Sequence, residues 1–91
     1  MTDGEGYELV LTPPAIRAIR TALPKPVAAA VIEFMTGPLI DHPRRVGRML
    51  RRELQGVWSA RRGTYRVLYR INDHTNEVIV VRIDHRRDVY H

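Results

Sequence analysis

The first part of the chain alternates between short apolar patterns and proline-rich breaks. A run of alternating apolar and polar residues at 7–11 predicts a strand. Thr12, followed by two prolines, is typical of a helix start, and apolar residues at helical spacing continue to residue 23. The prolines at 24–26 end this helix. A second helix is predicted from about Pro26 to Met35, where Gly37-Pro38 stops it.

Beyond residue 43 the apolar period changes from that of a helix to that of a strand. Further strands are predicted at 48–54, 57–62, 65–71 and 78–83, with turns at Gly56 and Gly63 and a polar hairpin loop at 72–76. The order β-α-α-β-β-β-β predicts an α+β fold, in which two antiparallel helices pack on one face of a twisted, mostly antiparallel sheet of about four to five strands. We expect a single domain over residues 1–91, with residues 1–6 flexible.

The other face of this sheet is predicted to be open and basic. In the strand 65–71 the odd positions are Tyr, Val, Tyr and Ile and the even positions are Arg, Leu and Arg, so the even side chains face away from the helices. In 57–62 neither face is cleanly apolar, which leaves open whether Arg61 or Arg62 points outward. The residues expected to gather on one concave face are Arg61 or Arg62, Arg66, Arg70 and Arg82.

Composition agrees with one folded domain and narrows its chemistry. The chain has 91 residues, 44% of them hydrophobic and 27% charged, as in ordinary globular proteins. Because it has no cysteine, disulfides, thiolate metal sites and thiol nucleophiles are excluded. His42 and His74 lack the spacing of metal ligands, and we expect no metal and no cofactor.

Charge is distributed unevenly along the chain. Residues 1–40 carry three basic against four acidic residues, a net of −1, whereas residues 41–91 carry twelve arginines against six acidic residues, a net of +6. Arginine pairs with phosphate oxygens in two places and stacks on bases. A nucleic acid or an acidic protein is therefore the expected partner.

No segment of the sequence suggests export or a membrane. The first six residues are polar and acidic where a signal peptide would be basic and then apolar, and the apolar stretch 27–35 is short and contains Glu33. We expect a cytoplasmic protein that does not bind a membrane.

Three blocks in fixed order carry a family resemblance: L-x-G at 54–56, R-x-G-x-Y-R-V-L-Y at 61–69, and H-R-x-x-V-Y at 85–90. Together they closely resemble the RelE/ParE superfamily of toxins from bacterial toxin–antitoxin pairs, and the resemblance covers nearly the whole chain. RelE-like members cleave messenger RNA in the ribosomal decoding site, and ParE-like members inhibit DNA gyrase. Arg66 and a closing basic cluster with Tyr90 make this chain look RelE-like.

The resemblance implies a ribosome-dependent endoribonuclease that needs no metal and uses the ribose 2′-hydroxyl as nucleophile. The candidate catalytic residues are Arg61, Arg66, His85, Arg86 and Tyr90, and the candidate RNA-binding residues are Arg62, Arg70, Arg82 and Arg87. The arginines would stabilise the extra negative charge of the phosphorane. Either His85 or Tyr90 would move a proton, with a structural role as the alternative for His85 and base stacking as the alternative for Tyr90. Some RelE members carry lysines on the strand at 57–61, whereas here no lysine follows Lys25.

The same resemblance implies the partners. These are a cognate antitoxin of RelB type or similar, the ribosome and its messenger RNA, and operator DNA bound through the antitoxin. A ParE-like gyrase inhibitor without nuclease activity is the alternative function, and an inactive relative that acts only as a DNA-binding corepressor is a third.

Overall fold

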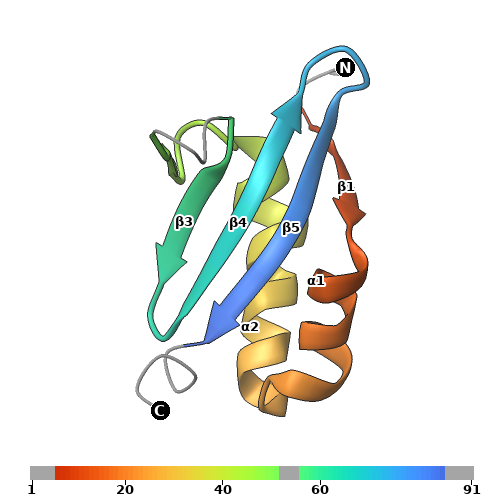
Figure 1. Ribbon diagram of the computed structural model, residues 1–91, viewed down its shortest axis with the longest axis vertical. Helices are drawn as coiled ribbons and strands as arrows, with labels where there is room; N and C mark the ends of the chain where they lie inside the picture. Colours follow the sequence, from red (N-terminus) through yellow and green to blue (C-terminus); the bar gives the residue numbers. More distant parts are fainter. Residues whose placement is uncertain (1–5, 52–55, 86–91) are drawn as a thin grey trace.

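The computed structural model describes residues 6–51 and 56–85 as helices layered on one sheet (Figure 1). The elements in chain order are β1 (Glu8–Leu11), α1 (Pro13–Arg17), η1 (Ala18–Ala22), α2 (Lys25–Phe34), η2 (Met35–Leu39), β2 (Arg48–Met49), β3 (Trp58–Arg62), β4 (Tyr65–Asn72) and β5 (Glu77–His85). The strand expected at 48–54 is only two residues long in its described part, and 52–54 lie outside the described residues. Of the segment 1–6 that was expected to be flexible, all but Gly6 also lies outside them.

The sheet has five strands in the order β1-β5-β4-β3-β2. Neighbouring strands are antiparallel except for β1 and β5, which run parallel and pair Glu8 with Glu77 through Leu11 with Val80. A parallel pair needs a crossover, and the long path through both helices supplies it. The α+β class, with two helical segments on one face of a mostly antiparallel sheet, is confirmed.

Both helical segments finish in wider π turns, and the second continues past its expected end. The first runs through η1, where the Leu23 amide donates to the Ala18 carbonyl over 2.9 Å. The second runs through η2 and includes Pro38, so the prediction that Gly37-Pro38 stops it is wrong. Proline has no N–H to donate, and a five-residue turn is one way to accommodate it. Within the described ranges no helix is long and apolar enough to cross a membrane.

The core lies between the helices and the odd-numbered side chains of β4. Its largest fully buried side chains are Tyr69, Met35, Leu39, Val31, Val67, Val78 and Val80. In Figure 1 helix α2 passes behind β4 and β5, and the Phe34 and Tyr65 rings meet there with centroids 6.4 Å apart. Burial on β4 alternates as the sequence pattern predicts, so its even-numbered residues face away from the helices.

A β-bulge interrupts the pairing of β4 with β5. Leu68 pairs with Arg82 whereas the next residue, Tyr69, pairs with Val80, which leaves Val81 as the extra residue. Thr12, which the sequence suggested as a helix cap, makes no capping bond. Its hydroxyl instead lies 2.9 Å from the Val80 carbonyl oxygen and 3.0 Å from that of Val81, so it fastens the start of α1 to the bulge.

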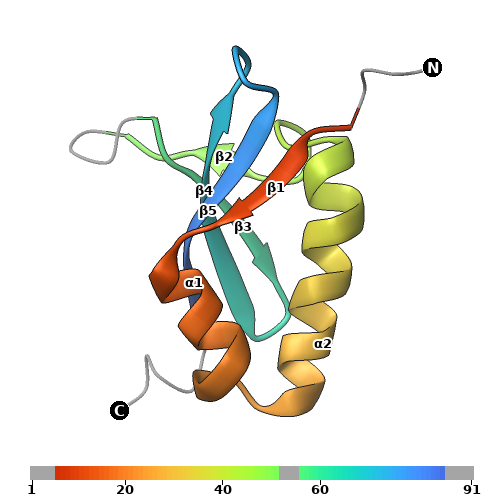
Figure 2. The same ribbon diagram turned by 90° about the vertical axis from the view of Figure 1, so that its right-hand side faces the viewer.

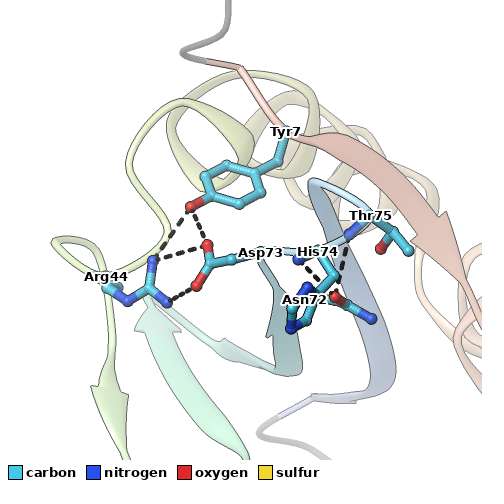
Figure 3. Close-up of polar contacts among 6 residues, drawn as sticks. All are labelled: Tyr7, Arg44, Asn72, Asp73, His74 and Thr75. Atoms are coloured by element: carbon cyan, nitrogen blue, oxygen red, sulfur yellow. Dashed lines mark hydrogen bonds and ion pairs between the residues drawn. The ribbon is translucent and has the colours of Figure 1, made fainter.

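A polar cluster joins the tip of the β4–β5 hairpin to two other segments (Figure 3). The Arg44 Nη2 lies 2.7 Å from Asp73 Oδ2, and the Tyr7 hydroxyl donates to Asp73 Oδ1 over 2.8 Å. The Arg44 guanidinium, and after it the Tyr7 hydroxyl, lower the pKa of the Asp73 carboxyl. Figure 2 shows this hairpin projecting beyond the helices, so the cluster holds its exposed tip in place.

Candidate nucleic-acid interface

The sheet face that the helices leave open is rich in arginine. Residues paired directly across neighbouring strands share a face. Arg66 at the centre of this face pairs with Arg61 of β3 on one side and with Asp84 of β5 on the other. The adjacent row across the sheet is Arg48, Ser59, Leu68 and Arg82. The expected basic face therefore exists, and Arg61, not Arg62, is the arginine that β3 contributes to it.

An open groove of about 500 Å³ lies on this face, beside the short edge strand β2. Its lining combines four arginines with a hydroxyl, two apolar side chains and a glycine: Arg45, Val46, Gly47, Arg48, Leu50, Ser59, Arg61 and Arg66. Guanidinium groups on several sides of one open groove suit a polyanion whose charges are spaced along a chain. The charge and openness of the groove therefore suit a polyanion better than a small neutral ligand.

Sequence reasoning missed Arg45 and Arg48, which form one wall of the groove. Arg48 can be placed through its pairing with Ser59. Ser59 is two residues before Arg61 and therefore on the same face of β3, so Arg48 shares the face of Arg61 and Arg66. Arg45 lies in the loop before β2, where no periodic pattern exists. A groove wall formed by a loop is visible only once the loop has been placed against the sheet.

The loop that carries this wall is fixed by a close approach to the sheet. A Cβ atom at Gly47 would collide with the Tyr69 hydroxyl and lie 2.8 Å from the Ser59 carbonyl oxygen, so only glycine fits. The buried Tyr69 hydroxyl donates to the Pro43 carbonyl over 2.6 Å. Burial raises the pKa of the Tyr69 phenol to about 12, partly offset by the charge of Arg62, so it remains a donor at neutral pH.

Two predicted site residues lie on the opposite face of the sheet. Arg62 pairs with the buried Tyr65, and its guanidinium stacks 4.9 Å from the centre of the Phe34 ring. His85 also pairs with Tyr65 and is only 7% exposed. The structure therefore does not bring Arg62 or His85 together with Arg61 and Arg66. Arg62 and His85 each occupy a position in their strand whose side chain faces the helices.

The remaining candidates differ in position. Arg70 is exposed on the open face but is not part of the groove lining. Arg82 is also exposed on that face, and its Nε lies 2.7 Å from Asp84 Oδ1, so an acidic neighbour offsets its charge. Arg86, Arg87 and Tyr90 lie outside the described residues. Over residues 6–51 and 56–85 no group of three side chains could hold a metal ion.

A small domain with helices on one face of a mixed sheet and an arginine-lined groove on the other belongs to a known structural class. Residues 9–90 match the model of the family described as the ParE toxin of type II toxin–antitoxin systems, parDE. The chain therefore belongs to this toxin family, within the RelE/ParE superfamily.

Its relatives carry RelE-type names. The chain is 57% identical to Toxin RelG of Mycobacterium tuberculosis over 68 residues, which cover 75% of this chain and 78% of the relative. It is 42% identical to Toxin RelE of the same organism over 90 residues, covering 99% and 92%. At this level of identity the protein is a RelE-family toxin of a type II toxin–antitoxin system.

Solved structures agree with this fold. The toxin–antitoxin complex RelBE2 from M. tuberculosis contains a chain that matches with a TM-score of 0.86 and 51% identity over 89% of this chain and 99% of that one. A chain of the intact E. coli RelBE complex matches with a TM-score of 0.69 and 20% identity over 87% and 95%, which supports the fold alone.

Proposed function

We propose that this toxin is a metal-independent endoribonuclease that cleaves messenger RNA on the ribosome and so arrests translation and growth. The observation that carries the proposal is the direct pairing of Arg61 with Arg66 in a groove open to solvent. Such a pair is suited to a phosphate that gains negative charge as the reaction proceeds.

In the proposed reaction the ribose 2′-oxygen attacks the adjacent phosphorus and the bond from phosphorus to the 5′-oxygen breaks. The products are a 2′,3′-cyclic phosphate and a free 5′-hydroxyl. Arg61 and Arg66 stabilise the phosphorane, and Arg86 is proposed to assist on the basis of the family resemblance. Solvent water is proposed to accept the proton of the 2′-hydroxyl, and Tyr90 is proposed to donate a proton to the 5′-oxygen as it leaves.

The position of His85 argues against its use as a proton shuttle. Its side chain is buried on the helix face, opposite the groove arginines. A proton shuttle must come within hydrogen-bond reach of the reacting oxygen. We therefore assign His85 a packing role beside Tyr65.

The ribosome is the proposed source of substrate positioning. The groove is open to solvent, so the domain alone fixes few of the substrate's degrees of freedom. Held on the ribosome, the messenger RNA would already have lost much of its translational and rotational freedom. The protein is accordingly proposed to act in the cytoplasm.

A cognate antitoxin of RelB type is the proposed inhibitor, since similar toxins have been solved as RelBE complexes. We propose that acidic residues of the antitoxin cover the groove and that the complex binds operator DNA through the antitoxin. Arg61→Glu with Arg66→Glu should then weaken the complex by about tenfold or more in titration calorimetry. Unchanged affinity would exclude groove filling.

Mapping transcripts after brief induction tests the proposed activity. Primer extension should find new 5′ ends inside translated reading frames, and an Arg66→Ala toxin should produce none. Cuts spread equally over untranslated RNA would contradict the ribosome requirement. The absence of cuts during growth arrest would contradict the nuclease activity.

The alternative is a gyrase inhibitor, and the observation in its favour is that the matching family model is described as ParE. Such a protein would act by binding without chemistry of its own. Induction would stop DNA replication before translation and produce double-strand breaks. Pulse labelling of protein and DNA synthesis in the first minutes after induction separates the two functions.

A further inference from the structure

The groove contains a second pair of arginines that has no role in the proposed reaction. Arg48 and Arg45 line it together with Arg61 and Arg66, but they come from β2 and the preceding loop rather than from β3 and β4. Both side chains are exposed. The groove is therefore basic on two sides.

The sheet register fixes how far Arg48 lies from the central pair. Arg48 pairs with Ser59, and Arg61 is two residues further along β3 on the same face. Such diagonal neighbours have Cα atoms about 7–8 Å apart. Arginine side chains are long enough to cross this distance, so what the register supplies is a second row of cations beside the central pair. Two successive phosphates of a single strand could then each meet one row.

The wall that bears these two arginines is anchored by the backbone. The Arg45 and Val46 amides donate to the His42 carbonyl over 3.0 and 3.2 Å. The carbonyl of Pro43 accepts the Tyr69 hydroxyl, and Gly47 sits against Ser59. The wall is thus preorganised, so an RNA strand need not order the loop when it binds.

We propose that Arg48, supported by Arg45, is a positioning residue that binds the phosphate next to the one that is cleaved. This inference rests on the proposed nuclease function, and it adds a second phosphate subsite to it. Ser59, the cross-strand partner of Arg48, and Leu50 also line the groove and would contact the ribose beside that phosphate.

Salt dependence of RNA binding tests this subsite without any chemistry. The probe is a short fluorescein-labelled single-stranded RNA with 2′-deoxy residues, which cannot be cleaved, and fluorescence anisotropy gives its affinity between about 50 and 200 mM salt. Each lost phosphate contact should reduce the slope of log K against log salt by about 0.7 for a single strand. We expect this reduction for Arg48→Ala and a loss of affinity of about tenfold at the lowest salt, while Arg48→Lys should keep most of the slope.

A matched control separates a subsite from a general loss of charge. Arg20 is an exposed arginine of η1, in the helical layer, and Arg20→Ala should leave the slope unchanged. Equal slopes for Arg48→Ala and Arg20→Ala would overturn the inference, as would failure of the wild-type protein to bind the oligonucleotide at the lowest salt.

Cleavage on programmed ribosomes distinguishes this inference from the proposed function. Arg48→Ala should raise the toxin concentration needed for half-maximal cleavage by about tenfold and leave the maximal single-turnover rate within about twofold. A lower maximal rate with an unchanged half-maximal concentration would place Arg48 in the chemistry and contradict a positioning role. If the wild type does not cleave, the nuclease proposal fails, and the anisotropy series still decides whether Arg48 contacts a phosphate.

Discussion

Arg61 and Arg66 are direct cross-strand partners in β3 and β4, and their side chains share the open face of the sheet. Like charges placed opposite each other destabilise a sheet. An anion between them removes that repulsion, so an unfavourable pairing in the free protein becomes a favourable one when a phosphate is bound. The position of these two arginines is thus better explained by binding than by stability.

Replacing Arg66 with alanine should therefore abolish cleavage without lowering stability. We expect the maximal single-turnover rate to fall by about 10²–10³-fold, because one preorganised cation is removed from the transition state. The free energy of unfolding, measured in urea, should stay the same or rise by up to about 1 kcal/mol. A folded Arg66→Ala protein that cleaves at the normal rate would refute the assignment.

The neighbouring Arg62 provides the matched comparison, since it lies on the other face against Phe34. Arg62→Ala should lower the free energy of unfolding by about 0.5–1 kcal/mol through loss of the cation–π contact, and cleavage should persist. Arg66→Ala should thus lower activity without lowering stability, whereas Arg62→Ala should lower stability without abolishing activity. Loss of cleavage in a stable Arg62→Ala protein would show that the helix-side arginine takes part after all.

Gly47→Ala should disturb the groove through its loop. The added methyl group would meet the Tyr69 hydroxyl and the Ser59 carbonyl, so the loop must move away from the sheet. We expect a loss of about 1–3 kcal/mol in urea unfolding together with weaker RNA binding. Gly37→Ala is the control, because a Cβ atom there has open space: it should leave RNA binding unchanged and should not lower the free energy of unfolding, since alanine favours a helical segment over glycine.

The buried Tyr69 should make the protein sensitive to alkali. Its pKa is about 12 in the folded chain against a usual 10.0, so the unfolded chain loses the phenolic proton first. The stabilising effect of the neutral phenol is complete below pH 10 and is lost as the pH rises from about 10 to 12. Urea unfolding at several pH values should show a steeper decline for wild type than for Tyr69→Phe, and equal slopes would argue against this burial effect.

His85→Gln should affect folding more than catalysis. Because the imidazole is buried beside Tyr65, we expect a lower melting temperature. The single-turnover rate should remain within about twofold of wild type, and its pH profile between about 5 and 8 should keep its shape. A flattened profile in the variant would restore His85 as a proton shuttle.

The sequence predicted the fold class and the open face of β4 because both depend on strong local periodicity. Alternation of Tyr, Val and Tyr with Arg, Leu and Arg left one consistent assignment for residues 65–70. The parallel pairing of β1 with β5 is a long-range contact with no local signal. The same holds for the groove wall, where Arg45 and Arg48 depend on how a loop packs.

The end of the second helix and the faces of Arg62 and His85 also depend on tertiary packing, which the local pattern does not contain. A shift of one residue moves a side chain to the other face, and the strand at 57–62 has no clean alternation that fixes its register. At the second helix, Gly37 and Pro38 are usual stop signals, but the apolar side chains of Met35 and Leu39 are both buried in the core. Burial of those side chains outweighs the local preference to end the helix.

The bulge at Val81 shifts the alternation of buried and exposed side chains along β5 by one residue. Before it the even-numbered Val78 and Val80 are buried, and after it the odd-numbered Ile83 and His85 are buried. Removing Val81 would therefore restore one regular alternation, because Val80 would be followed directly by Arg82 and every later side chain of the strand would keep its face. The deletion would leave the Arg82 guanidinium outside and Ile83 in the core, and its cost would be local: the bend of the bulge and the contact between the Thr12 hydroxyl and the Val81 carbonyl would be lost.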